Sequence, residues 1–141
     1  MIQRRQKGMT LIELVIVIAV VAILGGIAYP SYIAYMQRGN RAAAKAVLDQ
    51  AAQYMERQFT TTNVYPDSVQ FAAAGYNVAP LGSSGPTKKY DVTLTAATPT
   101  AFTLRATPTS GSVDPKCGWL ALDNLGNRAS ELGVARECWD R

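Results

Sequence analysis

Glu13 is the residue whose position most clearly calls for a chemical explanation. It is the only charged residue between Lys7 and Arg38, and it lies inside a long apolar stretch. A carboxylate in such a segment is costly, so we expect it to have a function and a partner. A helix needs about 20 apolar residues to cross a bilayer, and residues 9–29 supply that length. The cations that precede this stretch would hold the N-terminus on the cytoplasmic side; they are Arg4, Arg5 and Lys7.

The residues around Glu13 form a motif that resembles the N-terminus of type IV pilins. A short basic leader is followed by Gly8, then by Met9-Thr10-Leu11-Ile12-Glu13, and then by the apolar run. This resemblance implies that a prepilin peptidase cuts after Gly8 and that Met9, where the family usually has Phe, is then N-methylated. It also implies that Glu13 of one subunit meets the new Met9 amine of a neighbour during filament assembly.

Two simpler interpretations of this N-terminus compete with the pilin motif. A basic stretch followed by an apolar run is also typical of an ordinary secretory signal or a simple anchor, with a cleavage site for the former available in residues 22–28. An ordinary signal leaves Glu13 unexplained, because the carboxylate would lie near the start of its apolar core. Glu13 by itself is also compatible with a carboxylate stabilised by the dipole at a helix N-terminus.

The two cysteines, Cys117 and Cys138, lie near the C-terminus of a chain expected to be exported. The compartment beyond the bacterial inner membrane permits disulfides, and an even count of two favours one bridge. Such a bridge would stabilise the head by roughly 3 kcal/mol on the chain-entropy model. The alternative is a pair of unbonded, buried thiols.

The composition excludes several kinds of chemistry. The sequence has no histidine, so histidine catalysis and histidine metal sites are excluded, and two cysteines cannot make a four-cysteine zinc site. Neither a phosphate-binding glycine loop nor a cluster of carboxylates in an apolar setting is present. We therefore expect a protein that is not an enzyme and has no cofactor or metal.

A set of basic residues in the C-terminal half could contact DNA phosphates. These residues are Lys88, Lys89, Arg105, Lys116, Arg128 and Arg136. The competing interpretation is a solvated surface, because acidic residues lie among them, namely Asp91, Asp114, Asp123, Glu131, Glu137 and Asp140. The formal net charge of +4 also depends mainly on the leader, whose removal leaves only +1 on the side chains.

The first element that must position these residues is one long helix, predicted over about residues 9–59. Pro30 lies inside it and predicts a kink near Tyr29. Beyond Arg38 the apolar residues recur at three- and four-residue spacing, which predicts one buried stripe; they are Ala44, Val47, Leu48, Ala51, Met55 and Phe59. The polar residues on the other faces are Arg41, Lys45, Asp49, Gln53, Glu56 and Arg57.

The second predicted element is an antiparallel sheet of about four strands. Residues 64–87 are rich in glycine and proline and predict a connecting loop, with one short helical turn near residues 68–74. Period-two alternation then predicts a hairpin over residues 90–105, a third strand over 119–123 and a fourth beginning at Arg128. A long helix on an antiparallel sheet is an α+β arrangement, which is also the fold that the pilin resemblance implies.

The resemblance extends to the C-terminal half of the chain. Residues 117–126, followed by Cys138 and Trp139, resemble short pilins of the E type and their competence relatives. We therefore expect a leader at 1–8, a transmembrane and filament-core helix at 9–36 and a head domain at 37–141.

The resemblance implies a structural subunit of a type IV pilus that serves adhesion, twitching motility or DNA uptake. The implied partners are other pilin subunits, the prepilin peptidase, the inner-membrane assembly platform and, before assembly, the membrane. The implied location is the inner membrane for the precursor and the cell surface for the filament. Two alternatives stay open: a DNA-binding competence pilin and a pseudopilin of a type II secretion system.

Overall fold

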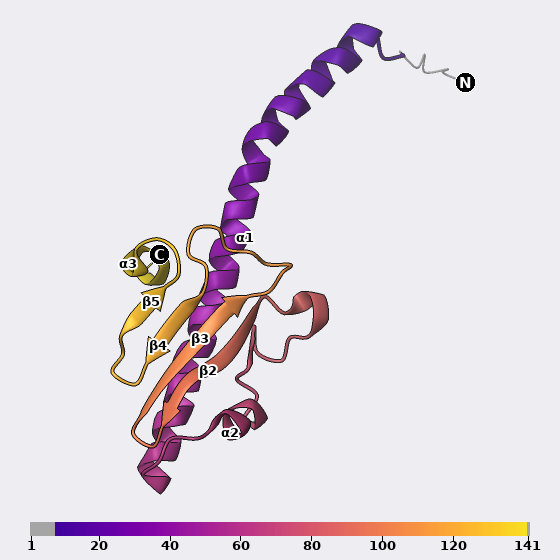
Figure 1. Ribbon diagram of the computed structural model, residues 1–141. Helices are drawn as coiled ribbons and strands as arrows, with labels where there is room; N and C mark the ends of the chain where they lie inside the picture. Colours follow the sequence, from indigo (N-terminus) through magenta and orange to yellow (C-terminus); the bar gives the residue numbers. More distant parts are fainter. Residues whose placement is uncertain (1–7, 141) are drawn as a thin grey trace, which may run out of the picture. The chain divides into compact units, whose positions relative to one another are not determined.

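A computed structural model describes residues 8–140 (Figure 1). Its contacts divide the chain into two units, with the boundary between Met36 and Gln37. The predicted leader residues before Gly8 lie outside the described residues.

The first helix, α1, spans Leu11–Thr62 and runs through Pro30 without interruption. It ends three residues later than the sequence predicted, and the threonine hydroxyls of its last turn bond back to carbonyls of the preceding turn. Thr61 and Thr62 donate to the carbonyls of Arg57 and Gln58 at 2.8 and 2.9 Å. Asn63 then stops the helix with a left-handed φ of 58°.

The remaining elements belong to the second unit (Figure 1). In chain order they are α2 (Ser68–Ala73), β1 (Val78–Ala79), the 3₁₀ helix η1 (Gly85–Thr87), β2 (Tyr90–Thr98), β3 (Ala101–Pro108), β4 (Leu120–Asp123), β5 (Arg128–Ser130) and α3 (Ala135–Asp140). The strands form an antiparallel sheet in the order β1-β2-β3-β4-β5. The predicted α+β arrangement is therefore confirmed.

The sheet has one strand more than the predicted four. The additional strand, β1, has only two residues and lies in the segment that the sequence predicted as a loop. Two residues are too few to show alternation, so the pattern could not reveal it. The short C-terminal helix α3 was likewise not predicted, whereas the helical turn at α2 was.

The core of the head lies between the C-terminal half of α1 and one face of the sheet (Figure 1). The helix contributes the predicted stripe, of which Ala44, Leu48 and Met55 are fully buried. The sheet contributes the alternating residues of the central strands, which are Tyr90, Val92, Phe102, Leu104, Leu120 and Leu122. The apolar residues predicted from the helical period and those predicted from the strand period thus meet in one core.

The prediction was wrong for Arg41 and Asp114, which the sequence analysis placed on the surface. Both are buried, with 4% and 3% of their surface exposed. Arg41 can lie on the buried face of α1 because Asp114, which is also buried, supplies its counter-charge. A buried charge is tolerated when it is paired and hydrogen-bonded.

Candidate functional site

The first candidate site is the start of α1, where Thr10 and Glu13 bond to each other. The Thr10 amide and hydroxyl both donate to Oε2 of Glu13, at 2.9 and 2.8 Å. The Glu13 amide in turn donates to the Thr10 hydroxyl at 3.3 Å. This reciprocal arrangement is a capping box, and it satisfies amides that the first helical turn would otherwise leave unpaired.

Thr10 belongs to this candidate site, although the sequence analysis gave it no role. The signal was present, because Thr followed three residues later by Glu at a helix start is the capping-box pattern. The consequence is that Oε2 carries both intrachain bonds. Among residues 8–140, Oε1 of Glu13 has no hydrogen-bond partner and stays open to another group.

The apolar side chains of α1 that follow Glu13 are exposed. An 18-residue window of this helix is long and apolar enough to cross a membrane, and none of it is buried within the chain. Leu14, Ile18 and Leu24 each expose about half or more of their surface. The described residues therefore leave this surface to be covered by lipid or by other chains.

The second candidate site is the set of six basic residues on the head, which lie on different elements. Four of them contact carboxylates: Lys88 with Asp91 (2.7 Å), Lys116 with Glu137 (3.7 Å), Arg128 with Asp49 (4.0 Å) and Arg136 with Asp140 (3.7 Å). Lys89 donates to the carbonyl of Pro86 at 3.1 Å. These contacts reduce the charge that most of the set could offer to phosphates.

Two of the basic residues, Arg105 and Arg128, lie over aromatic rings, but only Arg128 also contacts a carboxylate among residues 8–140. The guanidinium of Arg105 lies 4.4 Å from the ring centroid of Trp119, which precedes the neighbouring strand β4. Its Nε is buried and has no hydrogen-bond partner among residues 8–140. Arg105 and Trp119 thus form a stacked pair of an aromatic ring and a cation on the sheet.

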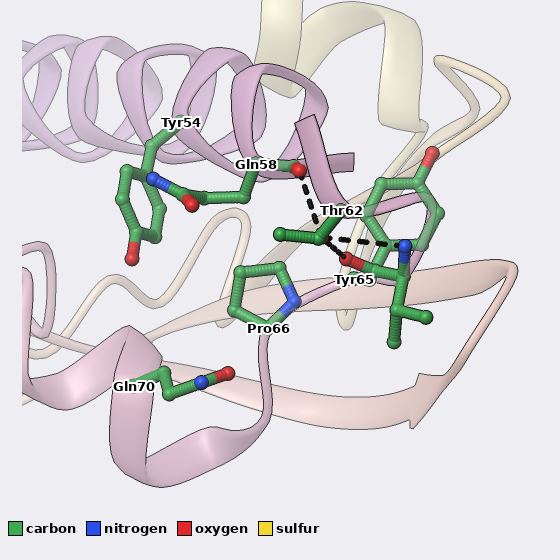
Figure 2. Close-up of a pocket in the computed structure, with 7 residues that line it drawn as sticks. Tyr54, Gln58, Thr62, Tyr65, Pro66 and Gln70 are labelled. Atoms are coloured by element: carbon green, nitrogen blue, oxygen red, sulfur yellow. Dashed lines mark hydrogen bonds between the residues drawn. The ribbon is translucent and has the colours of Figure 1, made fainter. Parts of the chain in front are cut away.

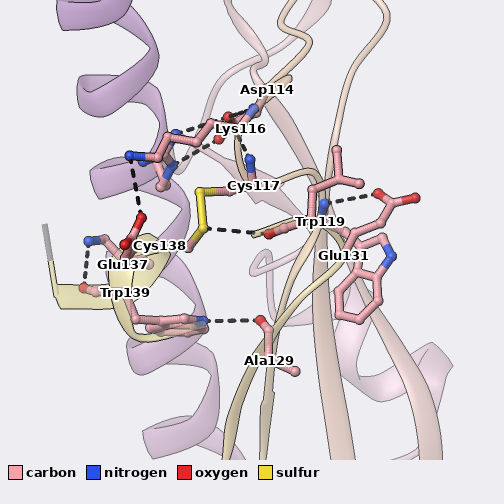
Figure 3. The surroundings of a disulfide bond; sticks show 12 residues. Asp114, Lys116, Cys117, Trp119, Ala129, Glu131, Glu137, Cys138 and Trp139 are labelled. Atoms are coloured by element: carbon pink, nitrogen blue, oxygen red, sulfur yellow. Dashed lines mark hydrogen bonds and ion pairs between the residues drawn. A yellow bond between two sulfur atoms is a disulfide. The ribbon is translucent and has the colours of Figure 1, made fainter. Parts of the chain in front are cut away.

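The predicted disulfide between Cys117 and Cys138 is present and links the loop before β4 to α3 (Figure 3). Both cysteines are fully buried. Lys45 of α1 donates to the carbonyl of Trp139 at 2.7 Å, and the Trp139 indole donates to the carbonyl of Ala129 at 3.1 Å. The bridge and these bonds fix α3 against α1 and β5.

Asp114 connects the disulfide loop to α1. Its carboxylate accepts from Nε and Nη2 of Arg41, at 2.8 and 2.9 Å, in a two-bond fork. It also accepts from the amides of Lys116 and Cys117 and from the hydroxyl of Tyr90. Burial alone would raise the pKa of Asp114, but Arg41 and the two amides outweigh burial and hold that pKa below its ordinary value.

Burial has the opposite outcome for the two tyrosines that face carboxylates. Burial, reinforced by Asp114, raises the pKa of Tyr90. Burial and the 2.8 Å bond to Glu56 raise the pKa of Tyr65 to about 12. Both phenols are therefore neutral at physiological pH and act as hydrogen-bond donors.

A pocket of about 250 Å³ lies where α1 ends and α2 begins (Figure 2). Its lining consists of Tyr54, Gln58, Thr62, Val64, Tyr65, Pro66 and Gln70. The Thr62 hydroxyl is already bonded to the carbonyls of Gln58 and Val64, both at 2.9 Å. The pocket is thus lined by two phenols, two side-chain amides and one hydroxyl. That hydroxyl, of Thr62, already takes part in the hydrogen bonds at the end of α1.

Comparison with known protein families gives two matches. The family model described as "Type IV minor pilin ComP, DNA uptake sequence receptor" matches residues 30–121. The model described as "Prokaryotic N-terminal methylation motif" matches residues 3–29, which include Gly8, Met9 and Glu13. Together the two matches extend from residue 3 into β4.

Curated relatives match the chain over part of its length. The type IV wide pilus major component PilA4 of Thermus thermophilus is 40% identical over 62 residues, which are 44% of this chain and 47% of that protein. The fimbrial protein EcpC of Eikenella corrodens is 37% identical over 75 residues, 53% of this chain and 48% of that protein. The chain thus spans about half the length of the curated relatives it matches.

A solved structure shares the fold. The crystal structure of the non-core minor pilin PilV of Neisseria meningitidis superimposes with a TM-score of 0.52 and 22% identity, and the match covers 70% of this chain and 90% of that one. At this identity the likeness concerns the arrangement of helix and sheet.

Proposed function

Because this chain belongs to the type IV pilins, we propose that it is a subunit of a type IV pilus, inserted in the inner membrane as a precursor and then assembled into a surface filament. The observation that carries the proposal is the start of α1. There an exposed apolar helix carries a single carboxylate, Glu13, whose Oε1 is open to a partner from another chain.

Maturation begins in this proposal with cleavage after Gly8 by a prepilin peptidase, followed by N-methylation of Met9. The match of the methylation motif to residues 3–29 supports both steps. Gly8 and Met9 precede α1 and are exposed, as a cleaved bond requires. Intact-mass measurement of filament protein is expected to show a chain that starts at Met9 with one added methyl group. A mature terminus beyond Ala22 would contradict the proposal.

Assembly then moves α1 from lipid into a bundle of like helices. Lipid is as apolar as the helix surface, so the transfer gains little from hydrophobic burial and must depend on packing and polar pairing. We assign the pairing to Oε1 of Glu13 and the Met9 amine of a neighbouring subunit, because a buried carboxylate requires a counter-charge. Head-to-tail contacts of this kind do not close into a ring, and they generate a filament.

Glu13→Gln tests the pairing, since it keeps the shape of the side chain and removes its charge. Cleavage and membrane insertion are expected to stay normal, while filaments become scarce or absent. Glu137→Gln is the matched control, because that carboxylate lies on the head and pairs with Lys116. Electron microscopy measures the number and length of filaments, and subcellular fractionation measures membrane insertion. Normal filament number and length in Glu13→Gln would leave the carboxylate with only its capping role.

Reception of DNA is a second candidate function, favoured by the family described as a DNA uptake sequence receptor. The head feature that fits this function best is the Arg105–Trp119 pair, because a guanidinium can meet a phosphate and an aromatic face can stack on a base. Adhesion and twitching motility are further roles of such a filament. The pseudopilin alternative gains no support from the relatives above, which are pilus proteins.

A further inference from the structure

Three tyrosines on α1 lie just after the apolar run and on one side of the helix. Tyr29, Tyr32 and Tyr35 follow one another at three-residue spacing, which places them within about a third of the helix circumference. Their exposed fractions are 70%, 59% and 67%, so the chain itself covers less than half of each. Among residues 8–140 none of the three hydroxyls has a hydrogen-bond partner.

The distance along the helix places these rings at the far side of a bilayer. With a rise of 1.5 Å per residue, the 20 steps from Met9 to Tyr29 extend about 30 Å, which is the thickness of the hydrocarbon core. The first charged residue after Glu13 is Arg38, one turn beyond Tyr35. The tyrosines therefore occupy the two turns in which the surroundings of a spanning helix change from hydrocarbon to water.

The side chain of tyrosine is better suited to the boundary between hydrocarbon and water than to either phase alone. Its ring is apolar, whereas its hydroxyl requires a hydrogen-bond partner that hydrocarbon lacks and the headgroup layer supplies. Tyrosine is accordingly enriched at membrane interfaces. A bundle of helices with leucine-like surfaces would leave three clustered hydroxyls to find partners among apolar side chains.

We propose that Tyr29, Tyr32 and Tyr35 anchor the precursor in the headgroup layer of the outer leaflet and thereby set the depth of α1 in the membrane. The proposal rests on the membrane-inserted precursor of the proposed function. The anchor opposes sinking of the helix toward the cytoplasm, and the leader cations oppose the reverse movement. Extraction into a filament must then withdraw three phenols from the headgroups.

The depth of the helix can be measured with single added cysteines on the full chain in vesicles of phosphatidylethanolamine and phosphatidylglycerol. The native cysteines are bonded to each other and buried, so a thiol-reactive spin label reports only the added residue. Ala28→Cys, Ile33→Cys and Gln37→Cys sample successive depths. Collision of the label with oxygen and with a water-soluble nickel chelate then locates the position at which lipid gives way to water.

We expect this crossing between residues 28 and 38. In the triple variant Tyr29→Leu, Tyr32→Leu, Tyr35→Leu the apolar stretch is longer, and the crossing should move toward the C-terminus by about one helical turn. Ile16→Leu, Val20→Leu, Ile23→Leu is the matched control, with three exposed apolar residues of the same helix exchanged, and it should leave the crossing in place.

Two results would overturn the anchor while the proposed function survives: a crossing outside residues 28–38, or an unchanged crossing in the triple tyrosine variant. The second result would assign the tyrosines to contacts within the filament. If every label meets the aqueous chelate, the chain does not insert, and the proposed membrane precursor fails together with the anchor.

Discussion

At the scale of single residues, Arg41 and Asp114 connect distant parts of the head through two buried hydrogen bonds. The fork between them joins α1 to a loop 73 residues away in the sequence. Removing one partner of a buried pair leaves an uncompensated charge, which costs far more than removing both. The coupling between the two side chains is therefore expected to appear as a difference in unfolding free energy between the single variants and the double variant.

Asp114→Leu is expected to lower the unfolding free energy of the head by about 3–5 kcal/mol, because Arg41 is then buried without a counter-charge. Arg41→Met with Asp114→Leu should cost clearly less than the sum of the two single variants. Urea unfolding of residues 37–141, followed by tryptophan fluorescence, measures each value. Additive losses would show that the two side chains do not depend on each other.

Acid should weaken the same contact. The pKa of folded Asp114 is lowered, so its contribution is complete above the unfolded value of about 3.9 and is lost as pH falls through the folded value. We expect the stability of the wild-type head to fall more steeply below pH 4 than that of Asp114→Asn. Unfolding curves at pH 7 and pH 3 test this. Parallel pH dependence in the two proteins would be the contrary result.

At the scale of elements, the disulfide holds the C-terminal helix in place. Cys117 and Cys138 are 21 residues apart and enclose β4, β5 and the start of α3. We expect Cys117→Ser to lower head stability by about 2–5 kcal/mol. The loss should be measurable by thermal or urea unfolding of the oxidised protein. Alkylation of the native, non-reduced chain should find no free thiol, and two alkylated thiols would contradict the bridge.

Gly118 shapes the chain where it enters β4. Its φ is +62°, and a Cβ at this position would lie 2.5 Å from Oε2 of Glu131, the carboxylate that accepts from the Trp119 amide. Gly118→Ala should therefore destabilise the head by more than 1 kcal/mol, on the order of the cost of backbone strain. Gly111→Ala is the control, because a Cβ there meets no atom within 4 Å and needs no positive φ. Equal unfolding midpoints for the two variants would refute this role.

The elements differ in how far the sequence could predict them. Periodicity over many residues fixed α1, the β2–β3 hairpin and the buried stripe, because each repeats its signal several times. The strand β1 has two residues and α3 has six, so neither repeats a pattern often enough. The Arg41–Asp114 fork depends on long-range placement, which no local pattern of charged residues reveals. Thr10, by contrast, could have been predicted from its spacing to Glu13.

At the scale of the whole molecule, charge limits how strongly DNA can be held. Residues 37–141 carry only a small positive excess, and four of the six candidate cations contact carboxylates. We expect weak duplex binding with a shallow salt dependence, because each neutralised phosphate adds only about −0.9 to the log–log slope. Titration of residues 37–141 with DNA at salt concentrations between about 50 and 200 mM measures this slope.

The matched variants for that titration are Arg105→Gln and Arg136→Gln. Arg105 stacks on Trp119, whereas Arg136 is exposed and contacts Asp140. If DNA uses the aromatic pair, the first variant should weaken binding more than the second. Tight, sequence-selective binding that persists at physiological salt would instead favour the receptor role over that of a general subunit.

The closed loop between Cys117 and Cys138 also has a consequence for cleavage by a protease. Leu125, at the turn between β4 and β5, exposes 79% of its side chain and is an accessible cleavage point. A cut there opens the polypeptide but releases no fragment, because the sulfur bridge still joins the two pieces. A nicked head would run as one species on a non-reducing gel and separate only after reduction, so damage at this turn leaves the chain in one covalent piece.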